Sequence, residues 1–260
     1  YLFLTLFSLL SVFPIYYMAC AATNKSVDVI RGKLIPGSYL FDNMKALLQS
    51  QDVGRAMVNS FKYALVCTLA SLLICSLAGY GFEIYYDKAK DNIFSIILLA
   101  MMVPFAATMI PLFRMFSNAH LFNTTLGFIL PSISTPFLIM MFRQSARSFP
   151  HDLIEAARID GVSEIGIFFK MFFPTMRSTY AAAMTITFMN AWNNYLWPKI
   201  IMLDDKRLTM PMLIANLTGG YLTDYGVLML GVLLCTLPTV ITFFLFQKSF
   251  ANGITGAVKG

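Results

Sequence analysis

Long apolar runs separated by short polar segments dominate this 260-residue chain. A helix that crosses a membrane needs about 20 mainly apolar residues. Six stretches meet this requirement, and they predict spanning helices over approximately residues 1–22, 56–85, 93–113, 124–142, 177–203 and 225–246. The pattern therefore predicts an all-α, polytopic membrane protein with six transmembrane helices, organised as one transmembrane domain over residues 1–260.

The segment over residues 143–176, called the 143–176 loop from here on, is a polar island between the fourth and fifth predicted spans. Pro150 suits the first position of a short helix, and Gly161 supplies a left-handed stop. Ser163 can cap a second short helix, and Pro174 is expected to end it. Two such short helices can bury little surface by themselves, so we interpret the loop as a docking element for another protein.

The polar segment over residues 23–55 contains one further helical pattern. Phe41, Met44, Leu47 and Leu48 share one face of a helix. This spacing predicts a short amphipathic helix that lies at the surface.

The second predicted span carries small residues at every fourth position, namely Cys67, Ser71, Cys75 and Gly79. Small side chains on one helix face allow another membrane helix to approach closely. The stripe therefore indicates helix packing rather than a binding function.

Proline recurs inside three of the predicted spans. A proline in a membrane helix kinks it and leaves a backbone carbonyl without its usual partner. The pattern favours helices that bend, either as part of a bundle that opens or as static irregular packing. The residues are Pro104, Pro111, Pro131, Pro136 and Pro238.

The amino-acid composition also indicates a membrane protein, and it excludes one class of function. The chain is 58% hydrophobic and 12% charged, with a mean hydropathy of +0.69, whereas a soluble domain is roughly a quarter charged. The net charge of +6 is modest and no basic stripe interleaves with aromatics, which excludes nucleic acid as a partner. Because the chain begins at Tyr1 within an apolar run, we expect a short N-terminal piece to be missing rather than a signal peptide to have been cleaved.

The four cysteines all lie within apolar runs, so no disulfide framework or metal-binding spacing can be built from them. We expect them to be small buried hydrophobic residues. They are Cys20, Cys67, Cys75 and Cys235.

The sequence lacks the residue patterns of ion-coupled carriers, ATP-binding sites, metal sites and enzymes. No charged residue lies deep within a predicted span, which argues against an ion-coupled carrier. No G-x-x-x-x-G-K-[ST] phosphate loop occurs, His120 and His151 stand alone, and no nucleophile has a recognisable base. We therefore predict no catalytic residues, no metal site and no cofactor in this chain.

The main polarity within the spans is an asparagine group in the fifth. Asn190, Asn193 and Asn194 have the spacing of one helix face, and Tyr195 follows them. These amides have two possible roles. They either form hydrogen bonds between helices or line the path of a hydrophilic solute.

The 143–176 loop also carries a family resemblance. Glu155-Ala156-Ala157, followed by Gly161 and then Pro174, resembles the EAA loop of permease subunits of ABC-type importers. Ile159-Asp160-Gly161 is similar to the version in carbohydrate-uptake permeases, the group of the second maltose-transporter membrane subunit. The loop ends in Met-Phe-Phe-Pro where the family has Ile-x-Leu-Pro, a change that keeps the apolar character. The remaining similar segments are residues 193–198, 208–211 and 253–260.

The resemblance implies a type I ABC importer permease fold in a bacterial inner membrane. The loop would be the cytoplasmic coupling helix, seated in a cleft of the ATPase, with Glu155 meeting a basic residue there. The basic residues of the chain divide almost evenly between the two sides, so the orientation rests on this resemblance. The implied coupling residues are Glu155, Ala156, Ala157, Asp160, Gly161 and Pro174.

The implied partners are a second homologous permease, two ATPase subunits that hold ATP and Mg²⁺, an extracytoplasmic sugar-binding protein and membrane lipid. The segment over residues 204–224 would face outward, near the docked binding protein. The expected function is sugar or oligosaccharide import. A polyol or glycerol phosphoester importer is the first alternative, although a phosphorylated solute would favour basic residues along the path. A membrane scaffold or enzyme without a transport role is the second.

Overall fold

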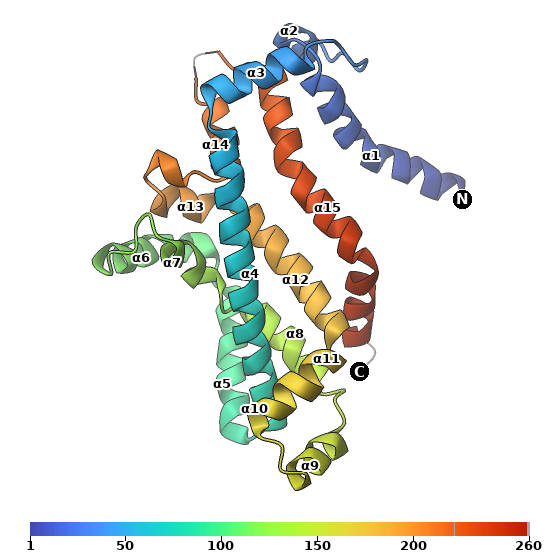
Figure 1. The fold of residues 1–260 in the computed structure, drawn as a ribbon, viewed down its shortest axis with the longest axis vertical. Helices are drawn as coiled ribbons and strands as arrows, with labels where there is room; N and C mark the ends of the chain where they lie inside the picture. The colour runs from blue at the N-terminus through green and yellow to red at the C-terminus, as the bar shows by residue number, and fades with distance from the viewer. Residues whose placement is uncertain (221, 259–260) are drawn as a thin grey trace. The chain divides into compact units, whose positions relative to one another are not determined.

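The computed structural model describes residues 1–220 and 222–258, with side chains described as far as residue 247. Every regular element in this part of the chain is helical (Figure 1). In order, the elements are α1 (Leu2–Ala22), α2 (Ser26–Ile30), α3 (Leu40–Ser50), α4 (Val53–Ile84), α5 (Lys88–Leu99), η1 (Ala100–Met102), α6 (Phe105–Asn118), α7 (Thr125–Ile129), η2 (Leu130–Ser132), α8 (Pro136–Ala146), α9 (His151–Ile159), α10 (Glu164–Ile167), η3 (Phe168–Phe172), α11 (Phe173–Thr175), α12 (Arg177–Trp192), α13 (Leu196–Ile201), η4 (Asp205–Arg207), α14 (Met210–Leu217) and α15 (Tyr225–Val258).

The chain groups into two compact units. The first comprises Tyr1–Phe61 and Asn194–Ile241, and the second comprises Lys62–Asn193 with the segment that follows from Thr242. The long helices α4 and α15 contribute to both units.

Three helices among the described residues are long and apolar enough to cross a membrane, namely α1, α4 and α15 through Gln247. In position, length and composition they agree with the first, second and sixth predicted spans. Two further pairs of helices meet the same criterion as bent spans, so the count reaches five if each pair is one span. The sixth helix is also longer than predicted, because α15 continues to Val258; the last two residues of the similar tail, 259 and 260, lie outside the described residues.

The third predicted span is broken rather than continuous. Residues 88–100 and 105–118 form separate helices that meet at 102°. Val103 lies in the extended region (φ −81°, ψ 116°) directly before Pro104, as expected from the clash between a proline ring and the residue before it. The prediction that proline would bend this span is confirmed, but a single helix over 93–113 is wrong.

The fourth predicted span breaks for the same reason. Thr135 is extended before Pro136, which opens α8, and the two helical pieces on either side meet at 55°. The continuous helix predicted over 124–142 is therefore replaced by α7, η2 and α8.

The fifth predicted span, 177–203, is also wrong in extent. Helix α12 ends at Trp192 after 16 residues, and the chain becomes helical again only at Leu196. In a continuous helix Pro198 would clash with the preceding turn. The restart at Leu196 places Pro198 in the first turn of α13, where its missing N–H costs no hydrogen bond.

The small-residue stripe of α4 packs as predicted. A Cβ added to Gly79 would lie 2.6 Å from Phe142 Cβ and 2.7 Å from Arg143 N, both on α8. Ser71 Oγ donates to Ser132 O at 3.0 Å. All four cysteines are buried, as predicted.

Within the first unit, α3 is tied to the end of α1. Asn43 Nδ2 donates to Ala22 O at 2.9 Å and to Asn24 O at 3.0 Å. Leu47 is buried, whereas Phe41 and Leu48 are exposed. The predicted amphipathic helix exists, but its apolar residues divide between an inward and an outward side.

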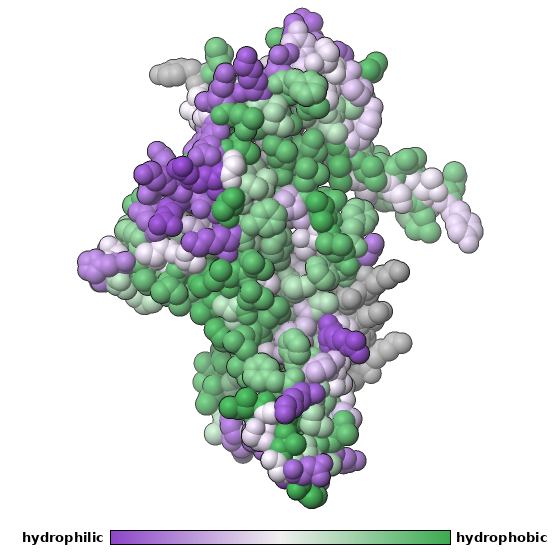
Figure 2. Space-filling view, in the orientation of Figure 1, coloured by the Kyte–Doolittle hydropathy of each residue, from purple (hydrophilic) through white to green (hydrophobic). Residues whose placement is uncertain are grey.

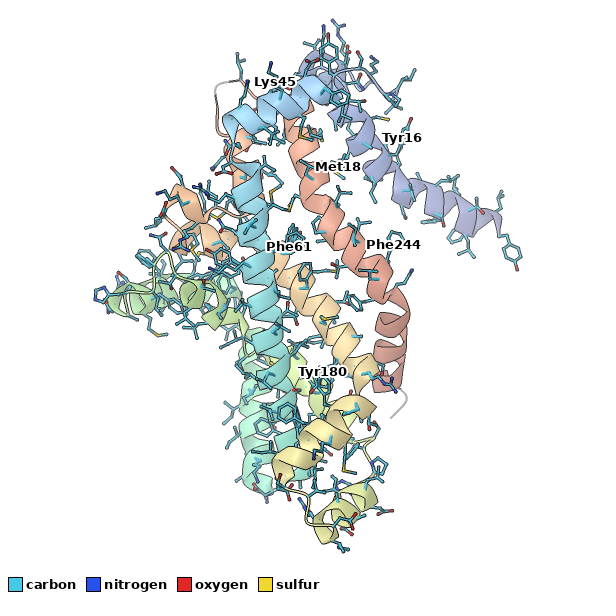
Figure 3. The ribbon with its side chains drawn as sticks, in the orientation of Figure 1. Tyr16, Met18, Lys45, Phe61, Tyr180 and Phe244 are labelled. Carbon is cyan, nitrogen blue, oxygen red and sulfur yellow. The ribbon has the colours of Figure 1, made fainter. Side chains whose placement is uncertain are left out.

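In the same unit, side-chain hydrogen bonds hold two of the segments that connect helices. Tyr16 lies on α1 (Figure 3), and its Oη donates to Leu34 O at 2.9 Å. Asn59 Nδ2, near the start of α4, donates to Lys206 O and Leu208 O, each at 2.9 Å. The Tyr16 bond holds the connection between α2 and α3, and the Asn59 bonds hold the first part of the 204–224 segment.

Large apolar side chains are exposed along most of α1, including Leu2, Phe3, Leu4 and Leu6 (Figure 2). A soluble protein buries such a helix, so its exposure fits a helix surrounded by lipid or by another membrane subunit.

Candidate functional site

The first half of the 143–176 loop is built by local rules. Pro150 precedes α9, in which Asp152 lies in the first turn and Arg158 in the last, each matching the helix dipole. Gly161 has a φ of +74°. Its N–H bonds to Arg158 O at 3.1 Å, and Val162 N–H bonds to Ala157 O at 2.9 Å. This pair of bonds is the Schellman closure of a helix, and it requires the left-handed glycine that the sequence predicts.

The second half of the loop begins as predicted and ends differently. Ser163 Oγ accepts a hydrogen bond from Gly166 N at 3.2 Å and caps α10. A π-helical turn, η3, then leads into α11, which contains Pro174. Pro174 does not end the helical stretch, which continues to Thr175. Because proline cannot donate to the preceding turn, the wider π turn before it accommodates the missing bond.

The loop divides its residues between an anchored side and an exposed side. Ile154 and Ala157 are buried, at 1% and 5% exposure, within the core of the second unit. Among the predicted coupling residues, Ala157 therefore packs inward, whereas the others are exposed. The exposed ones are Glu155, Ala156, Asp160, Gly161 and Pro174.

Exposed apolar residues accompany these polar ones. Ile159 is 86% exposed, Ile165 72% and Leu153 44%. Helix α9 lies at one end of the second unit (Figure 1). This apolar surface was not predicted from the sequence, although the i, i+3, i+6 spacing of Leu153, Ala156 and Ile159 indicates it.

An ion pair closes the loop across the Gly161 turn. Arg158 Nε donates to Glu164 Oε1 at 2.7 Å, and Arg158 Nη2 donates to Oε2 at 3.3 Å. The Arg158 guanidinium, followed by the Tyr85 hydroxyl, lowers the pKa of Glu164. The same pairing raises the pKa of Arg158. The two short helices are thus held together by a charged pair at the surface.

The predicted asparagine group does not form a single helix face. Asn190 lies near the end of α12 and is exposed. Asn193 follows the last helical residue, and its Nδ2 donates to Met189 O at 2.9 Å. Asn194 and Tyr195 lie in the connection to α13. The backbone N–H of Asn193 donates to the same carbonyl at 3.0 Å, so both groups of this residue bond to the last turn of α12.

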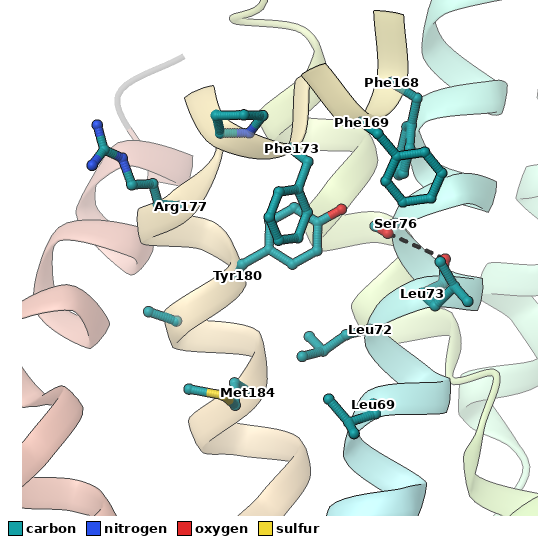
Figure 4. A pocket seen from close by; sticks show the side chains of 12 residues that line it. Leu69, Leu72, Leu73, Ser76, Phe168, Phe169, Phe173, Arg177, Tyr180 and Met184 are labelled. Atoms are coloured by element: carbon teal, nitrogen blue, oxygen red, sulfur yellow. Dashed lines mark hydrogen bonds between the residues drawn. The ribbon is translucent and has the colours of Figure 1, made fainter. Parts of the chain in front are cut away.

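The second unit contains a cavity of about 750 Å³ that the sequence did not indicate (Figure 4). The rings of Phe173 and Tyr180 lie 4.6 Å apart within it. The Arg177 side chain points away from Tyr180, and Ser76 Oγ is engaged with Leu73 O at 3.2 Å. The lining residues are Leu69, Leu72, Leu73, Ser76, Phe168, Phe169, Phe173, Pro174, Arg177, Tyr180, Ala181 and Met184. This mainly apolar lining suits apolar side chains or acyl chains better than a sugar, which needs many hydrogen-bond partners.

No three metal-binding side chains gather anywhere in the part of the chain that the structure describes. Helices long enough to cross a membrane, together with a loop that exposes large apolar side chains, are typical of a membrane protein that packs against other subunits. Residues 71–256 match the family described as the binding-protein-dependent transport system inner membrane component, and this chain belongs to that family. It is a multi-pass protein of the bacterial inner membrane.

Curated relatives match along the whole chain. The chain is 45% identical to the lactose transport system permease protein LacG of Rhizobium radiobacter, over 100% of this chain and 95% of that protein. It is 36% identical to the arabinooligosaccharides transport system permease protein AraQ of Bacillus subtilis, over 100% and 94%. These relatives are transport permeases, so the chain is a membrane component of a transport system rather than an enzyme.

A solved structure has the same fold. It is described as a bacterial ABC transporter involved in the import of the acidic polysaccharide alginate, and it matches with a TM-score of 0.84 over 96% of this chain and 94% of that chain. At 20% identity the match establishes the fold alone, which is the predicted type I importer permease fold. Family membership implies a partner permease, an ATPase and a binding protein in general terms.

Proposed function

We propose that this chain is one permease subunit of an ABC importer that moves a sugar or oligosaccharide into the cell. It forms half of the translocation pathway together with a second, homologous permease. Two ATPase subunits bind ATP and Mg²⁺, and this chain needs no cofactor of its own. An extracytoplasmic sugar-binding protein delivers the solute near the 204–224 segment, on the other side of the membrane.

The observation that carries this proposal is the construction of the 143–176 loop. Glu155 is exposed on α9, while Ile154 and Ala157 anchor the same helix in the core. An exposed carboxylate beside the apolar Ile159 can pair with a basic residue in an apolar cleft of the ATPase. Gly161 provides the turn, and Asp160 and Ala156 belong to the same exposed surface. The loop is then the cytoplasmic coupling element.

The transported solute is inferred from the relatives. LacG and AraQ are named for lactose and arabinooligosaccharides, and both names point to neutral sugars. The sn-glycerol-3-phosphate permease UgpE of Escherichia coli is also related, at 29% identity, so a glycerol phosphoester is the second candidate. The exposed amide of Asn190 is the pathway group we propose on α12, with Asn193, Asn194 and Tyr195 in the connection that follows.

The test is reconstitution of the four kinds of subunit in liposomes. ATP-dependent uptake of labelled lactose or arabinooligosaccharide supports the proposal. Uptake of sn-glycerol 3-phosphate in place of sugars favours the second candidate. Purification of this chain from native membranes as a stable single protein, with neither permease nor ATPase attached, contradicts both and leaves a scaffold or membrane enzyme.

A further inference from the structure

The last turn of α4 and the residue that follows it hold the 143–176 loop at two places. Glu83 Oε2 accepts hydrogen bonds from Arg143 Nε at 3.1 Å and from Arg147 Nε at 3.4 Å. Tyr85 Oη donates to Glu164 Oε2. Because the two arginines precede α9 and Glu164 follows it, both sides of α9 are fastened to one short stretch at the end of α4.

The first attachment is buried. Arg143 is only 3% exposed. Its Nη2 also donates to Asp91 Oδ1 of α5 at 2.8 Å, and its guanidinium carbon lies 4.3 Å from the centre of the Phe94 ring. A buried guanidinium is stable only while its partners stay in place. The start of the loop is therefore fixed to both α4 and α5.

The second attachment converges on one carboxylate. Glu164 accepts from Arg158 at the end of α9 and from Tyr85 beyond the end of α4. The turn at Gly161 is thus closed by the ion pair and joined to α4 by the tyrosine hydroxyl. Removing that hydroxyl leaves the ion pair intact, so Tyr85 can be tested separately from the fold of the loop.

Aromatic packing stiffens the region between the two attachments. The Tyr80 ring of α4 lies 5.3 Å from Phe168 and 4.8 Å from Phe172, centre to centre. Phe172 in turn lies 5.6 Å from Phe149, which precedes α9. Close-packed interiors transmit displacement rather than absorb it. The end of α4 and the loop are therefore built to move as one body.

We propose that Glu83 and Tyr85 are positioning residues that pass the movement of the docked 143–176 loop into α4. This inference rests on the proposed importer function. When the ATPase displaces α9, the loop cannot absorb the shift internally, because α4 holds it on both sides. The displacement enters α4, a helix of 32 residues, and changes its position.

The experiment compares Tyr85→Phe and Glu83→Gln with a matched control in the reconstituted transporter. Tyr86→Phe is the control, because Tyr86 is the adjacent tyrosine and its side chain is exposed. ATP hydrolysis and sugar uptake are measured in the same vesicles, and the recovered complex is quantified. We expect both variants to assemble and hydrolyse ATP, while the sugar moved per ATP falls by about 2- to 30-fold, the range of mutations that modulate coupling. Tyr86→Phe retains the wild-type ratio.

Three outcomes separate the explanations. A wild-type ratio in Tyr85→Phe overturns the inference while leaving the importer function in place. A second result is that uptake and ATP hydrolysis both fall in proportion to the amount of assembled complex. That result indicates that the residues have only a structural role, and it also overturns the inference. Absence of sugar uptake by the wild-type complex instead contradicts the proposed function itself. If Glu83→Gln fails to assemble, Tyr85→Phe decides alone, since it removes only one surface hydroxyl.

Discussion

Gly79 of α4 and Phe142 of α8 approach so closely that a Cβ on the glycine would lie 2.6 Å from Phe142 Cβ. The backbone of α8 is equally near, with Arg143 N at 2.7 Å and Ile139 O at 2.9 Å from the same position. Neither helix backbone can move away without disturbing Arg143, whose guanidinium holds Glu83 and Asp91. The small residue at position 79 thus sets the spacing on which the attachment of the 143–176 loop depends.

We predict that Gly79→Ala destabilises the protein by about 1–3 kcal/mol, the typical cost of overpacking a well-filled interior. The measurement is the thermal unfolding temperature of the detergent-solubilised chain. Gly81→Ala is the matched control, because nothing lies within 4 Å of the Cβ it would add to the same helix. Alanine has the better helix propensity, so this control is expected to raise stability by up to about 1 kcal/mol. Equal unfolding temperatures for the two variants would contradict the packing argument.

Glu155→Lys is expected to impair ATPase docking without affecting membrane insertion. Glu155 is exposed on α9, so the folded permease tolerates the change, whereas a lysine facing a basic residue of the ATPase repels it. We expect ATPase affinity and uptake to fall on the order of tenfold or more, which corresponds to about 1.4 kcal/mol or more. Co-purification of the ATPase and uptake are measured together, with Glu155→Gln expected to lie between wild type and Glu155→Lys. Wild-type uptake with lysine in place would remove Glu155 from the coupling role.

The local construction of the 143–176 loop could be predicted from the sequence because it depends on near neighbours. Gly161, Ser163 and the acidic first turn of α9 act within four residues along the chain, where turn and cap rules apply. The attachment of the loop could not be predicted. Arg143 and Glu83 are 60 residues apart in the chain, and no local pattern shows which of the charges near helix ends will meet.

The sequence predicted the helix bounds well where length and hydropathy determine them. It predicted them poorly where a proline interrupts the helix. Helices α1 and α4 match their apolar runs. Pro104 and Pro136 were recognised as points of bending, but the sequence did not distinguish a kink from a complete break. Asn193 illustrates a further limit, since its side-chain amide and its backbone N–H both donate to Met189 O at the end of α12. An apolar run continues past that residue although the helix does not.

Acidification should weaken the loop closure in a defined direction. The pKa of Glu164 lies below its usual value of 4.5, because Arg158 and then Tyr85 stabilise the carboxylate. A lowered pKa in the folded state contributes stability that is complete above the unfolded value and is lost as the pH falls through the folded value. The unfolding temperatures of wild type and Glu164→Gln should therefore differ at neutral pH and converge as the pH falls through the lowered pKa of Glu164. A difference that persists unchanged in acid would indicate that the charge of Glu164 is unimportant.

Asn190 and Asn193 should respond differently to substitution, although both are asparagines near the end of α12. The exposed side chain of Asn190 is the better candidate for the solute path, so Asn190→Leu is expected to change the uptake rate or sugar preference at an unchanged unfolding temperature. Asn193 Nδ2 donates to Met189 O, so Asn193→Ala should lower stability by about 0.5–1.5 kcal/mol, the net worth of a hydrogen bond. Uptake kinetics and thermal unfolding are measured on both variants. If Asn190→Leu lowers the unfolding temperature and leaves transport unchanged, the Asn190 amide serves helix packing, and the solute path lies along other residues.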